Sequence, residues 1–223
     1  MGNDKSIEVF GKLFIDGKST SKVILSNLHI VPGDNSPSEL FEININHAEI
    51  NGGSLYSPTG NSIYGSLILR DSFLYEVNKD GFNRMYLWYP QKDSYIDRNV
   101  FYNSGYISTG HRDADVYIMN NYFFTEDFAS EITGYAVENW AAYNESETIL
   151  KYNTFANTSG VAVSLPPGYS SALLNATENY WSTTSEDVIK SMIYDKSDDL
   201  AISSEIEFKP YLDEPDDNTP TPN

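Results

Sequence analysis

The most concentrated group of reactive side chains is the loop GHRDAD, which spans residues 110–115. His111 can transfer protons near neutral pH, because the unperturbed pKa of histidine lies in that range. Asp113 and Asp115 lie on one side of the chain if the loop is extended, and carboxylate oxygens suit a hard cation such as Ca²⁺. The loop is therefore a candidate binding site, although a solvated turn after Gly110 explains the same residues.

A second candidate is the aromatic stretch MYLWYP at residues 85–90. Alternation along a strand places Tyr86 and Trp88 on one face and Tyr89 on the other. Exposed rings beside polar groups are typical of carbohydrate sites, because the ring covers the apolar side of a sugar while polar groups bond its hydroxyls. The alternative is that Trp88 fills the core. The predicted carbohydrate-binding residues are Trp88, Tyr86, Tyr89, Tyr106, His111, Arg112 and Asp113.

Polysaccharide-active enzymes are the alternative class for the same residues. A lyase needs a basic residue beside a carboxylate that a cation neutralises. The basic candidates are Lys92, Arg98 and Arg112 near the middle coils, with Arg70 and Arg84 below. A glycoside hydrolase needs carboxylates roughly 5 to 9.5 Å apart, for which Asp97 and the aspartates of residues 110–115 are candidates. Neither set comes with a recognisable motif, so we assign no catalytic residue.

These candidates must be positioned by a repeat that runs through the chain. The phrase apolar-x-x-Asn-x-aromatic occurs as IDRNVF, IMNNYF and LKYNTF, with the variants ILRDSF and ATENYW on either side. Two earlier copies lack the Asn. The key positions 28, 48, 71, 99, 121, 153 and 179 are 20 to 32 residues apart. Such variable spacing excludes a coiled coil and indicates a solenoid whose loops differ in length.

The chemistry of the phrase predicts a stack of strands. Asn tolerates the left-handed backbone of a bend, and stacked strands lie about 4.8 Å apart, so the Asn side chains can form a hydrogen-bonded ladder. The aromatic residues then form a column in a thin core. The predicted column consists of Phe73, Phe101, Phe123, Phe155 and Trp181. One coil apart, His29 and His47 with Glu49 are a further metal-binding hypothesis.

The two ends of the repeat carry different patterns. Alternation from Ile7 to Leu13 predicts an opening strand. After the last copy, Thr183 and Glu186 have the spacing of a capping box before an apolar stripe, which predicts a helix over about 184–195 that covers the open core. The stretch IEFKPYL predicts a final strand. The acidic, Pro-rich residues 213–223 predict a linker or tail.

The I-x-x-N-x-F copies, followed by NYWSTTSEDVIKSMIYDKSDD and IEFKPYL, resemble the right-handed parallel β-helix proteins of the pectate-lyase-like superfold. The resemblance covers roughly residues 7–212. It implies an all-β fold, namely a single-stranded right-handed parallel β-helix of about seven coils with a short C-terminal capping α-helix. We therefore expect a β-helix domain over residues 1–212 and a tail over 213–223. Most members of the superfold are extracellular or cell-surface proteins, which implies the same location here, but they share no single activity.

Charge and composition limit the partners. The chain has 14 basic and 32 acidic residues, with a formal charge of −18. This charge argues against nucleic acid and suits Ca²⁺ or a neutral or cationic ligand. There is no Cys, and no apolar run approaches the roughly 20 residues of a spanning helix, so we expect no membrane insertion.

The leading hypothesis is a non-catalytic extracellular module that binds carbohydrate or mediates surface attachment. We expect it to be a monomeric domain of a longer secreted or cell-surface chain, with polysaccharide or another glycan as its partner. It requires no cofactor under this hypothesis, and bound Ca²⁺ is compatible with it. The alternative is a polysaccharide-active enzyme, above all a cation-assisted lyase, and a third option is a structural spacer without any ligand.

Overall fold

In the computed structural model nearly all of the regular secondary structure is β-strand. Three parallel sheets make up the body, and the helix of the described residues is α1 (Glu186–Ser191). Within this part of the chain, no helix has the length and apolar character needed to cross a membrane. The described residues are 5–33, 41–55, 65–79, 84–126, 131–142 and 146–222.

Each sheet is built from strands that pair with parallel neighbours. Sheet 1 has, in spatial order, β1 (Lys5–Val9), β3 (Val23–Pro32), β5 (Ala48–Leu55), β7 (Phe73–Tyr75), β10 (Val100–Tyr102), β13 (Tyr122–Phe124) and β16 (Thr154–Phe155). Sheet 2 has β2 (Lys12–Asp16), β4 (Glu42–Asn46), β6 (Ser66–Arg70), β9 (Ser94–Asp97), β12 (Val116–Met119) and β15 (Thr148–Lys151). Sheet 3 has β8 (Arg84–Trp88), β11 (Tyr106–His111), β14 (Val137–Ala142), β17 (Val163–Ser164) and β18 (Ile193–Tyr194).

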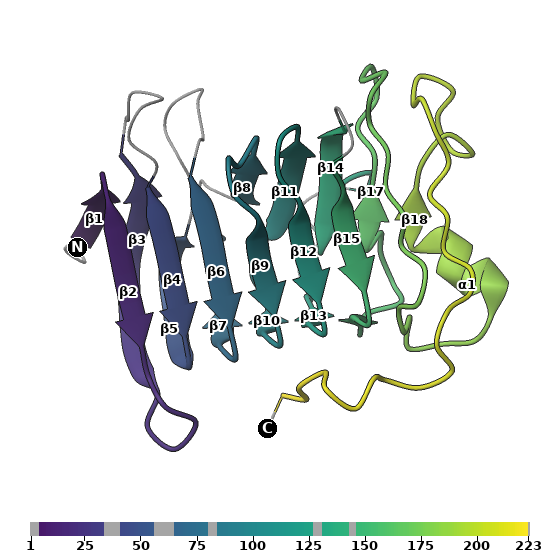
Figure 1. The fold of residues 1–223 in the computed structure, drawn as a ribbon. Helices are drawn as coiled ribbons and strands as arrows, with labels where there is room; N and C mark the ends of the chain where they lie inside the picture. The colour runs from purple at the N-terminus through teal and green to yellow at the C-terminus, as the bar shows by residue number, and fades with distance from the viewer. Residues whose placement is uncertain are drawn as a thin grey trace.

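The chain visits the sheets in a repeating order. It passes from sheet 3 to sheet 2 to sheet 1 in β8–β9–β10, and again in β11–β12–β13 and β14–β15–β16. Each strand therefore pairs with the strand of the same position in the next circuit, and the strands stack along one axis (Figure 1). Alternate residues of each strand face the enclosed core, as the alternating burial of β4 and β8 shows. The arrangement is compatible with the parallel β-helix expected from the sequence.

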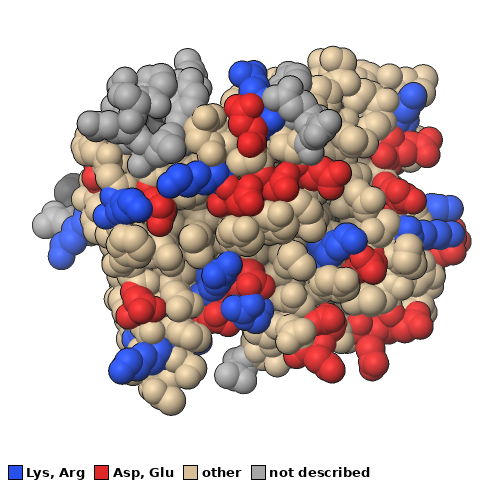
Figure 2. Space-filling model, viewed as in Figure 1, with Lys and Arg blue, Asp and Glu red and all other residues tan. Residues whose placement is uncertain are grey.

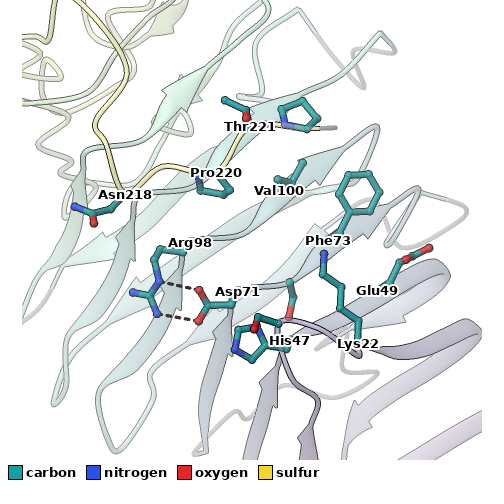
Figure 3. A pocket seen from close by; sticks show the side chains of 13 residues that line it. Lys22, His47, Glu49, Asp71, Phe73, Arg98, Val100, Asn218, Pro220 and Thr221 are labelled. Carbon is teal, nitrogen blue, oxygen red and sulfur yellow. Dashed lines mark hydrogen bonds and ion pairs between the residues drawn. The ribbon is translucent and has the colours of Figure 1, made fainter.

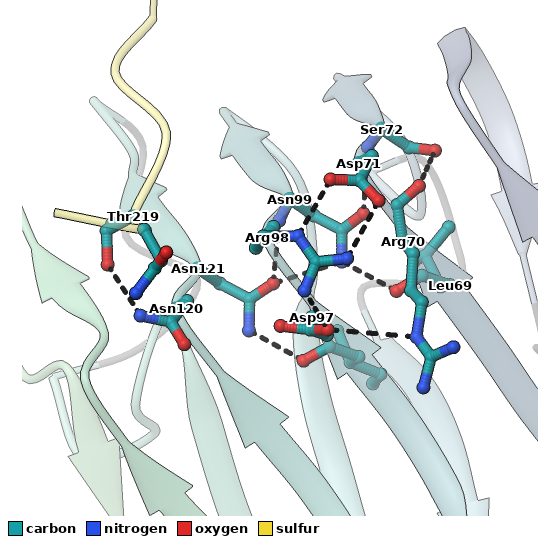
Figure 4. Close-up of polar contacts among 12 residues, drawn as sticks. Leu69, Arg70, Asp71, Ser72, Asp97, Arg98, Asn99, Asn120, Asn121 and Thr219 are labelled. Carbon is teal, nitrogen blue, oxygen red and sulfur yellow. Dashed lines mark hydrogen bonds and ion pairs between the residues drawn. The ribbon is translucent and has the colours of Figure 1, made fainter. Parts of the chain in front are cut away.

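An asparagine ladder connects the turns between sheets 2 and 1. The side chain of Asn99 donates to Asn121 (Nδ2 to Oδ1, 3.0 Å), Asn121 donates to Asn153 (3.1 Å), and Asn153 donates to Asn179 (3.0 Å). Figure 4 shows the first of these steps, with Asn121 also donating to the carbonyl of Ile96 at 2.9 Å. All four side chains are fully buried. The predicted ladder is confirmed at these four positions.

A column of rings lies beside the ladder in the core. Phe101 and Phe123 are stacked with ring centroids 4.8 Å apart, and Phe123 and Phe155 follow at 5.9 Å. Trp181 closes the column 4.6 Å from Phe155. Each of these rings is at most 3% exposed, so the rings stabilise the core by burying apolar area rather than by contacting a ligand.

The predicted register is wrong by one residue in the earlier copy ILRDSF. Strand pairing aligns Phe101 with Leu74 and Val100 with Phe73, so Leu74 occupies the core column and Phe73 lies outside it. Ser72, not Asp71, takes the ladder position, where its backbone N–H donates to Asn99 Oδ1 at 3.1 Å. The prediction failed because both Ile68 and Leu69 fit the apolar start of the phrase, so two registers one residue apart were possible. A shift of one residue moves every side chain to the other face of the strand.

The C-terminal end is shorter and less regular than predicted. Helix α1 lies inside the predicted range 184–195, and its residue Ile189 is buried. The capping box does not form, because Ser185 is the N-cap residue and makes no side-chain cap bond, while the Thr183 hydroxyl accepts from the Ser185 N–H. No strand forms over 206–212, where Glu207 makes an isolated bridge; Pro210 supplies no backbone donor for a ladder.

The acidic, Pro-rich tail packs along the body of the molecule. Residues 213–222 run back from the α1 end beneath the turns between sheets 2 and 1 (Figure 1). Asn120 donates to Asp216 (Nδ2 to Oδ1, 2.8 Å), and the Thr219 hydroxyl donates to the carbonyl of Tyr152 at 2.6 Å. Thr219 is buried by this contact. The tail thus supplies hydrogen bonds to two successive turns of the stack.

Candidate functional site

The outer side of sheet 3 carries the densest group of aromatic and charged side chains in the described chain. In β8, Met85 and Leu87 belong to the buried core, so the alternating residues Arg84, Tyr86 and Trp88 face outward. We call this surface the aromatic face. Its residues are Arg84, Tyr86, Trp88, Tyr106, Glu138 and Trp140.

Strand pairing brings side chains from three circuits onto the aromatic face. Ser108 of β11 lies between Tyr86 of β8 and Glu138 of β14. The pairing of β11 with β14 shifts register between Thr109 and Gly110, which pairs Gly110 with Ala141 and leaves Trp140 as the extra residue. A bulge of this kind re-aims a side chain. Trp140 lies beside Trp88 on the same face as Glu138.

The rings of the aromatic face form one continuous cluster. The Trp88 ring centroid lies 5.6 Å from that of Tyr86 and 5.4 Å from that of Trp140. Trp140 in turn meets Tyr169 edge-on at 4.5 Å. The guanidinium of Arg84 stands over the Tyr86 ring at 4.2 Å. The cluster spans strands β8 and β14 and includes two of the three tryptophans of the chain.

Polar groups lie within the same cluster. The indole of Trp140 donates to the carboxylate of Glu138, and the indole of Trp88 donates to Ser108 Oγ at 3.2 Å. Arg84 donates to the Tyr106 hydroxyl at 3.3 Å. Burial raises the pKa of Glu138, while the Trp140 hydrogen bond and the charge of Arg84 oppose that rise. Glu138 is therefore a desolvated carboxyl group beneath aromatic rings, which is unusual for an acidic residue.

Tyr89, Arg112 and Asp113 lie at the edge of the aromatic face. The Tyr89 ring meets that of Trp88 at 6.0 Å, and the Arg112 guanidinium stands over Tyr89 at 4.8 Å. Asp113 is exposed on the next turn, where its carboxylate accepts from Gln91 at 3.5 Å. Contacts thus link five of the seven residues of the predicted carbohydrate site, namely Tyr86, Trp88, Tyr89, Tyr106 and Arg112, the first and fourth through Arg84.

His111 is the member that the structure separates from the others. Its side chain is 1% exposed, and Nδ1 lies 3.1 Å from Ser146 Oγ. Among the described residues Nε2 has no hydrogen-bond partner. Burial lowers the pKa of His111 to about 4, although the charge of Asp115 opposes the shift. His111 is neutral near pH 7 and has no exposed surface with which to contact a ligand.

The other residues singled out in the sequence are distributed over different surfaces. Lys92 lies 3.8 Å from Glu42 on sheet 2, whereas Arg98 forms a two-pronged ion pair with Asp71 at 2.8 and 2.9 Å. Asp97 contacts Arg98 rather than the aspartates of the loop at residues 110–115. These basic and acidic residues therefore do not form one catalytic group with the aromatic face.

The histidines near the N-terminus take part in separate contacts. His29 Nδ1 lies 2.8 Å from Ser54 Oγ, while His47 and Glu49 line a pocket below sheet 1. No cluster of three or more His, Cys, Asp or Glu side chains suited to a metal ion occurs in the described residues.

The pocket beside His47 has a volume of about 500 Å³ and lies where the tail crosses the turns. Figure 3 shows Pro220 and Thr221 of the tail on one side, with Arg98 and Asp71 on the other. Arg98 and Asp71 are bonded to each other, so their charges cancel. Neither charge is therefore available in full to a ligand in this pocket. The aromatic face remains the stronger candidate for ligand binding.

Acidic side chains form a band over the beginnings of the sheet 2 strands. In this band the Asp93 carboxylate accepts from the backbone of Asp115 at 3.1 Å, and the Asp115 carboxylate accepts from the backbone of Glu147 at 2.8 Å. Figure 2 shows this red band across the middle of the molecule. Each of these carboxylates thus accepts a hydrogen bond from the backbone of the next circuit. The negative charge of the band also repels anionic partners from this side of the molecule.

Glu138 and Trp140 are the site residues that the sequence analysis did not predict. Both lie in VENW, on a strand inside the longest gap between repeat copies, so no copy of the phrase indicates its register. Alternation places Trp140 on the same face as Glu138, but it cannot show that the bulge leaves Trp140 without a partner on β11. The available signal was that Trp140 is one of only three tryptophans.

Comparison of the chain with family models, with curated proteins and with solved structures gave no match in any of the three. The functional conclusion therefore depends on the geometry of the site itself.

Proposed function

We propose that the chain is a non-catalytic carbohydrate-binding module that uses the aromatic face. Under this proposal the fold is a right-handed parallel β-helix of about seven coils, similar to the pectate-lyase-like proteins, with α1 as its C-terminal cap. The module belongs to a larger secreted or cell-surface protein and attaches it to a glycan. Ca²⁺ is an optional partner in this proposal.

The adjacency of Trp88 and Trp140 to the buried Glu138 carries the proposal. The two indole rings, 5.4 Å apart, offer apolar surface to the C–H faces of sugar rings. Arg84 is partly exposed and supplies a hydrogen-bonding group beside those rings, while the buried Tyr106 and Glu138 hold Arg84 and Trp140 in position. This combination of a mostly apolar surface with a few fixed polar groups is the usual composition of a small-ligand site.

Charge favours a neutral or cationic glycan over an acidic one. The chain carries a formal charge of −18, and Glu138 adds a carboxylate to the aromatic face itself. A uronic acid polymer would meet repulsion over most of the surface. We therefore expect neutral or amino-sugar polysaccharides to bind before pectin-like polymers.

A glycan array, probed with and without Ca²⁺, tests this function. We expect binding to neutral or amino-sugar glycans, and a loss of at least tenfold in affinity for Trp88→Ala and Trp140→Ala. Tyr117→Ala is the matched control, because Tyr117 also belongs to a ring pair, stacked 4.8 Å from Tyr95, but lies on sheet 2. Absence of binding to every glycan, or equal losses in all three variants, contradicts the proposal.

A polysaccharide lyase is the second candidate, favoured by the position of Arg112 at the edge of the aromatic face. A lyase releases unsaturated sugars, which absorb ultraviolet light, whereas a binding module releases none. Incubation with acidic polysaccharides and Ca²⁺ distinguishes the two. If product forms with the wild-type chain and not with Arg112→Ala, the protein is an enzyme.

A further inference from the structure

The N-terminal end of the stack exposes two strand edges. Strand β2 is the terminal strand of sheet 2 and β1 is the terminal strand of sheet 1, and among the described residues nothing pairs with their outer edges (Figure 1). Exposed strand edges are templates for pairing with another chain. The question is which strand would fit.

The backbone of β2 shows which of its groups face the open edge. Gly11 accepts from Glu42 and Gly17 donates to Asn46, both at 2.9 Å, at the two ends of the pairing with β4. In a parallel pair every second residue bonds to a given neighbour. Odd-numbered residues of β2 therefore bond to β4, and the N–H and C=O groups of Lys12, Phe14 and Asp16 point to the open edge.

We infer that a second copy of this chain pairs with β2, antiparallel and centred on Phe14. In this register Phe14 lies opposite Phe14 of the second copy, and Lys12 lies opposite Asp16 in both directions. All three outward-facing backbone positions of each strand then exchange hydrogen bonds, as in the closely spaced pairs of an antiparallel sheet. Sheet 2 becomes continuous across the two molecules.

Side-chain chemistry agrees with this register. Lys12, Phe14 and Asp16 are exposed on the outer face, while Leu13 and Ile15 pack inward. Residues directly opposite in an antiparallel pair share a face, so the pairing places two opposite charges together on each side of an aromatic pair. The sequence of β2, KLFID, is thus complementary to its own reverse in both charge and hydrophobicity.

The same end of the molecule is the most apolar and the least acidic. Four of its large hydrophobic side chains are between 37% and 66% exposed, namely Ile7, Phe10, Phe14 and Ile24. Over residues 5–24 there are four lysines and two acidic residues, although the whole chain has a charge of −18. Two copies can therefore approach at this end with less repulsion than elsewhere.

The opposite end limits the assembly to two copies. There α1 and the segment that follows it lie beyond the final strands (Figure 1), so the N-terminal end of one molecule does not meet a complementary strand edge on another. A contact between identical surfaces closes on itself and forms a dimer rather than a filament. A monomer is the prediction from the sequence, and a monomer and a dimer differ in mass.

Sedimentation equilibrium between roughly 1 and 500 μM tests the dimer. We expect the mass to rise from 25.1 kDa toward twice that value with concentration. Phe14→Lys should weaken association at least tenfold, because it places two cations opposite each other. Leu200→Lys is the matched control: Leu200 is 90% exposed near α1, so this variant should associate like the wild type.

A charge exchange tests the register itself. Asp16→Lys creates two Lys–Lys pairs and should also dissociate the dimer, whereas the double variant Lys12→Asp/Asp16→Lys restores opposite pairs and should recover association. Circular dichroism confirms that each variant is folded, since Lys12 also contacts Glu42 at 3.3 Å. A mass that stays at 25.1 kDa, one that grows beyond a dimer, or an exchange variant no better than Asp16→Lys overturns the inference.

Discussion

The indole N–H of Trp140 donates a hydrogen bond to the carboxylate of Glu138, two residues earlier in β14. In a regular strand both side chains would project from the same face in line with β11. The register shift between Thr109 and Gly110 pairs Gly110 with Ala141, so Trp140 has no partner on β11, and its ring lies 5.4 Å from that of Trp88. The rings of β8 and β14 thus form one cluster, and a carboxylate is hydrogen-bonded to one of them.

Glu138 should make stability depend on pH in a recognisable direction. Its raised pKa means that the folded protein holds the proton more tightly than the unfolded chain. Its contribution to the free energy of unfolding is complete below the unfolded value of about 4.5 and is lost as pH rises through the folded pKa. Urea unfolding should therefore show Glu138→Gln gaining stability relative to wild type between pH 4 and 7.

The control for this prediction is Glu205→Gln, which changes an exposed carboxylate. Its difference from wild type should vary less with pH than that of Glu138→Gln. A constant difference between Glu138→Gln and wild type across the pH range contradicts the assignment of a desolvated carboxyl group.

His111 should act in the opposite direction. Burial lowers its pKa from 6.5 to about 4. Between these two pH values the unfolded chain binds a proton on His111 and the folded protein does not. The contribution of His111 to the free energy of unfolding is complete above pH 6.5 and is lost as the pH falls through 4. Its size is on the order of 3 kcal/mol. His111→Asn should remove this acid sensitivity. The measurement is the urea midpoint at pH 4, 5 and 7, with His47→Asn as the control in a half-exposed position.

The part of the fold that the sequence predicts correctly is the part where copies are identical. Asn99, Asn121 and Asn153 recur in one phrase, and equivalent residues of a stack must occupy equivalent places. The prediction failed at Asp71 and Phe73, where apolar residues fit two registers that differ by one. Packing decides between such registers, and it involves neighbours that are distant in the sequence.

The site was predictable to a similar extent. Alternation placed Tyr86 and Trp88 together, and the structure has both on the outer side of sheet 3. It could not give the position of Trp140 relative to β11, because a bulge depends on how two strands pair rather than on either strand alone. Nor could it exclude His111, which is buried and lies beside Ser146, a residue 35 positions further along the chain.

The tail should contribute measurable stability. A chain that ends at Leu212 loses the bonds from Asn120 to Asp216 and from Thr219 to Tyr152, which should cost about 1–3 kcal/mol. Thr219→Val tests one of these bonds without changing shape, and we expect a loss of about 1 kcal/mol in urea unfolding. Thr221→Val is the matched control in an exposed position and should have no effect. Equal effects of the two valine variants would mean that the tail does not stabilise the turns.

The central step of the asparagine ladder should be the most costly single position to change. Asn121 donates to Ile96 and Asn153 and accepts both from the backbone and from the side chain of Asn99. Asn121→Ala leaves these buried groups without partners, and each unsatisfied group costs about 1–3 kcal/mol. We therefore expect a loss of about 4 kcal/mol in urea unfolding at pH 7, on the assumption that some groups find water.

Asn175→Ala provides the comparison, because Asn175 is exposed and its side chain accepts one local bond from Thr177. Its loss should stay below about 1 kcal/mol. Asn121→Asp sharpens the test: it keeps the acceptor for Asn99 but removes both donors and buries a charge, so it should cost at least as much as Asn121→Ala. If Asn121→Ala is no more damaging than Asn175→Ala, the ladder does not hold the circuits together, and the ring column from Phe101 to Trp181 must carry that stability alone.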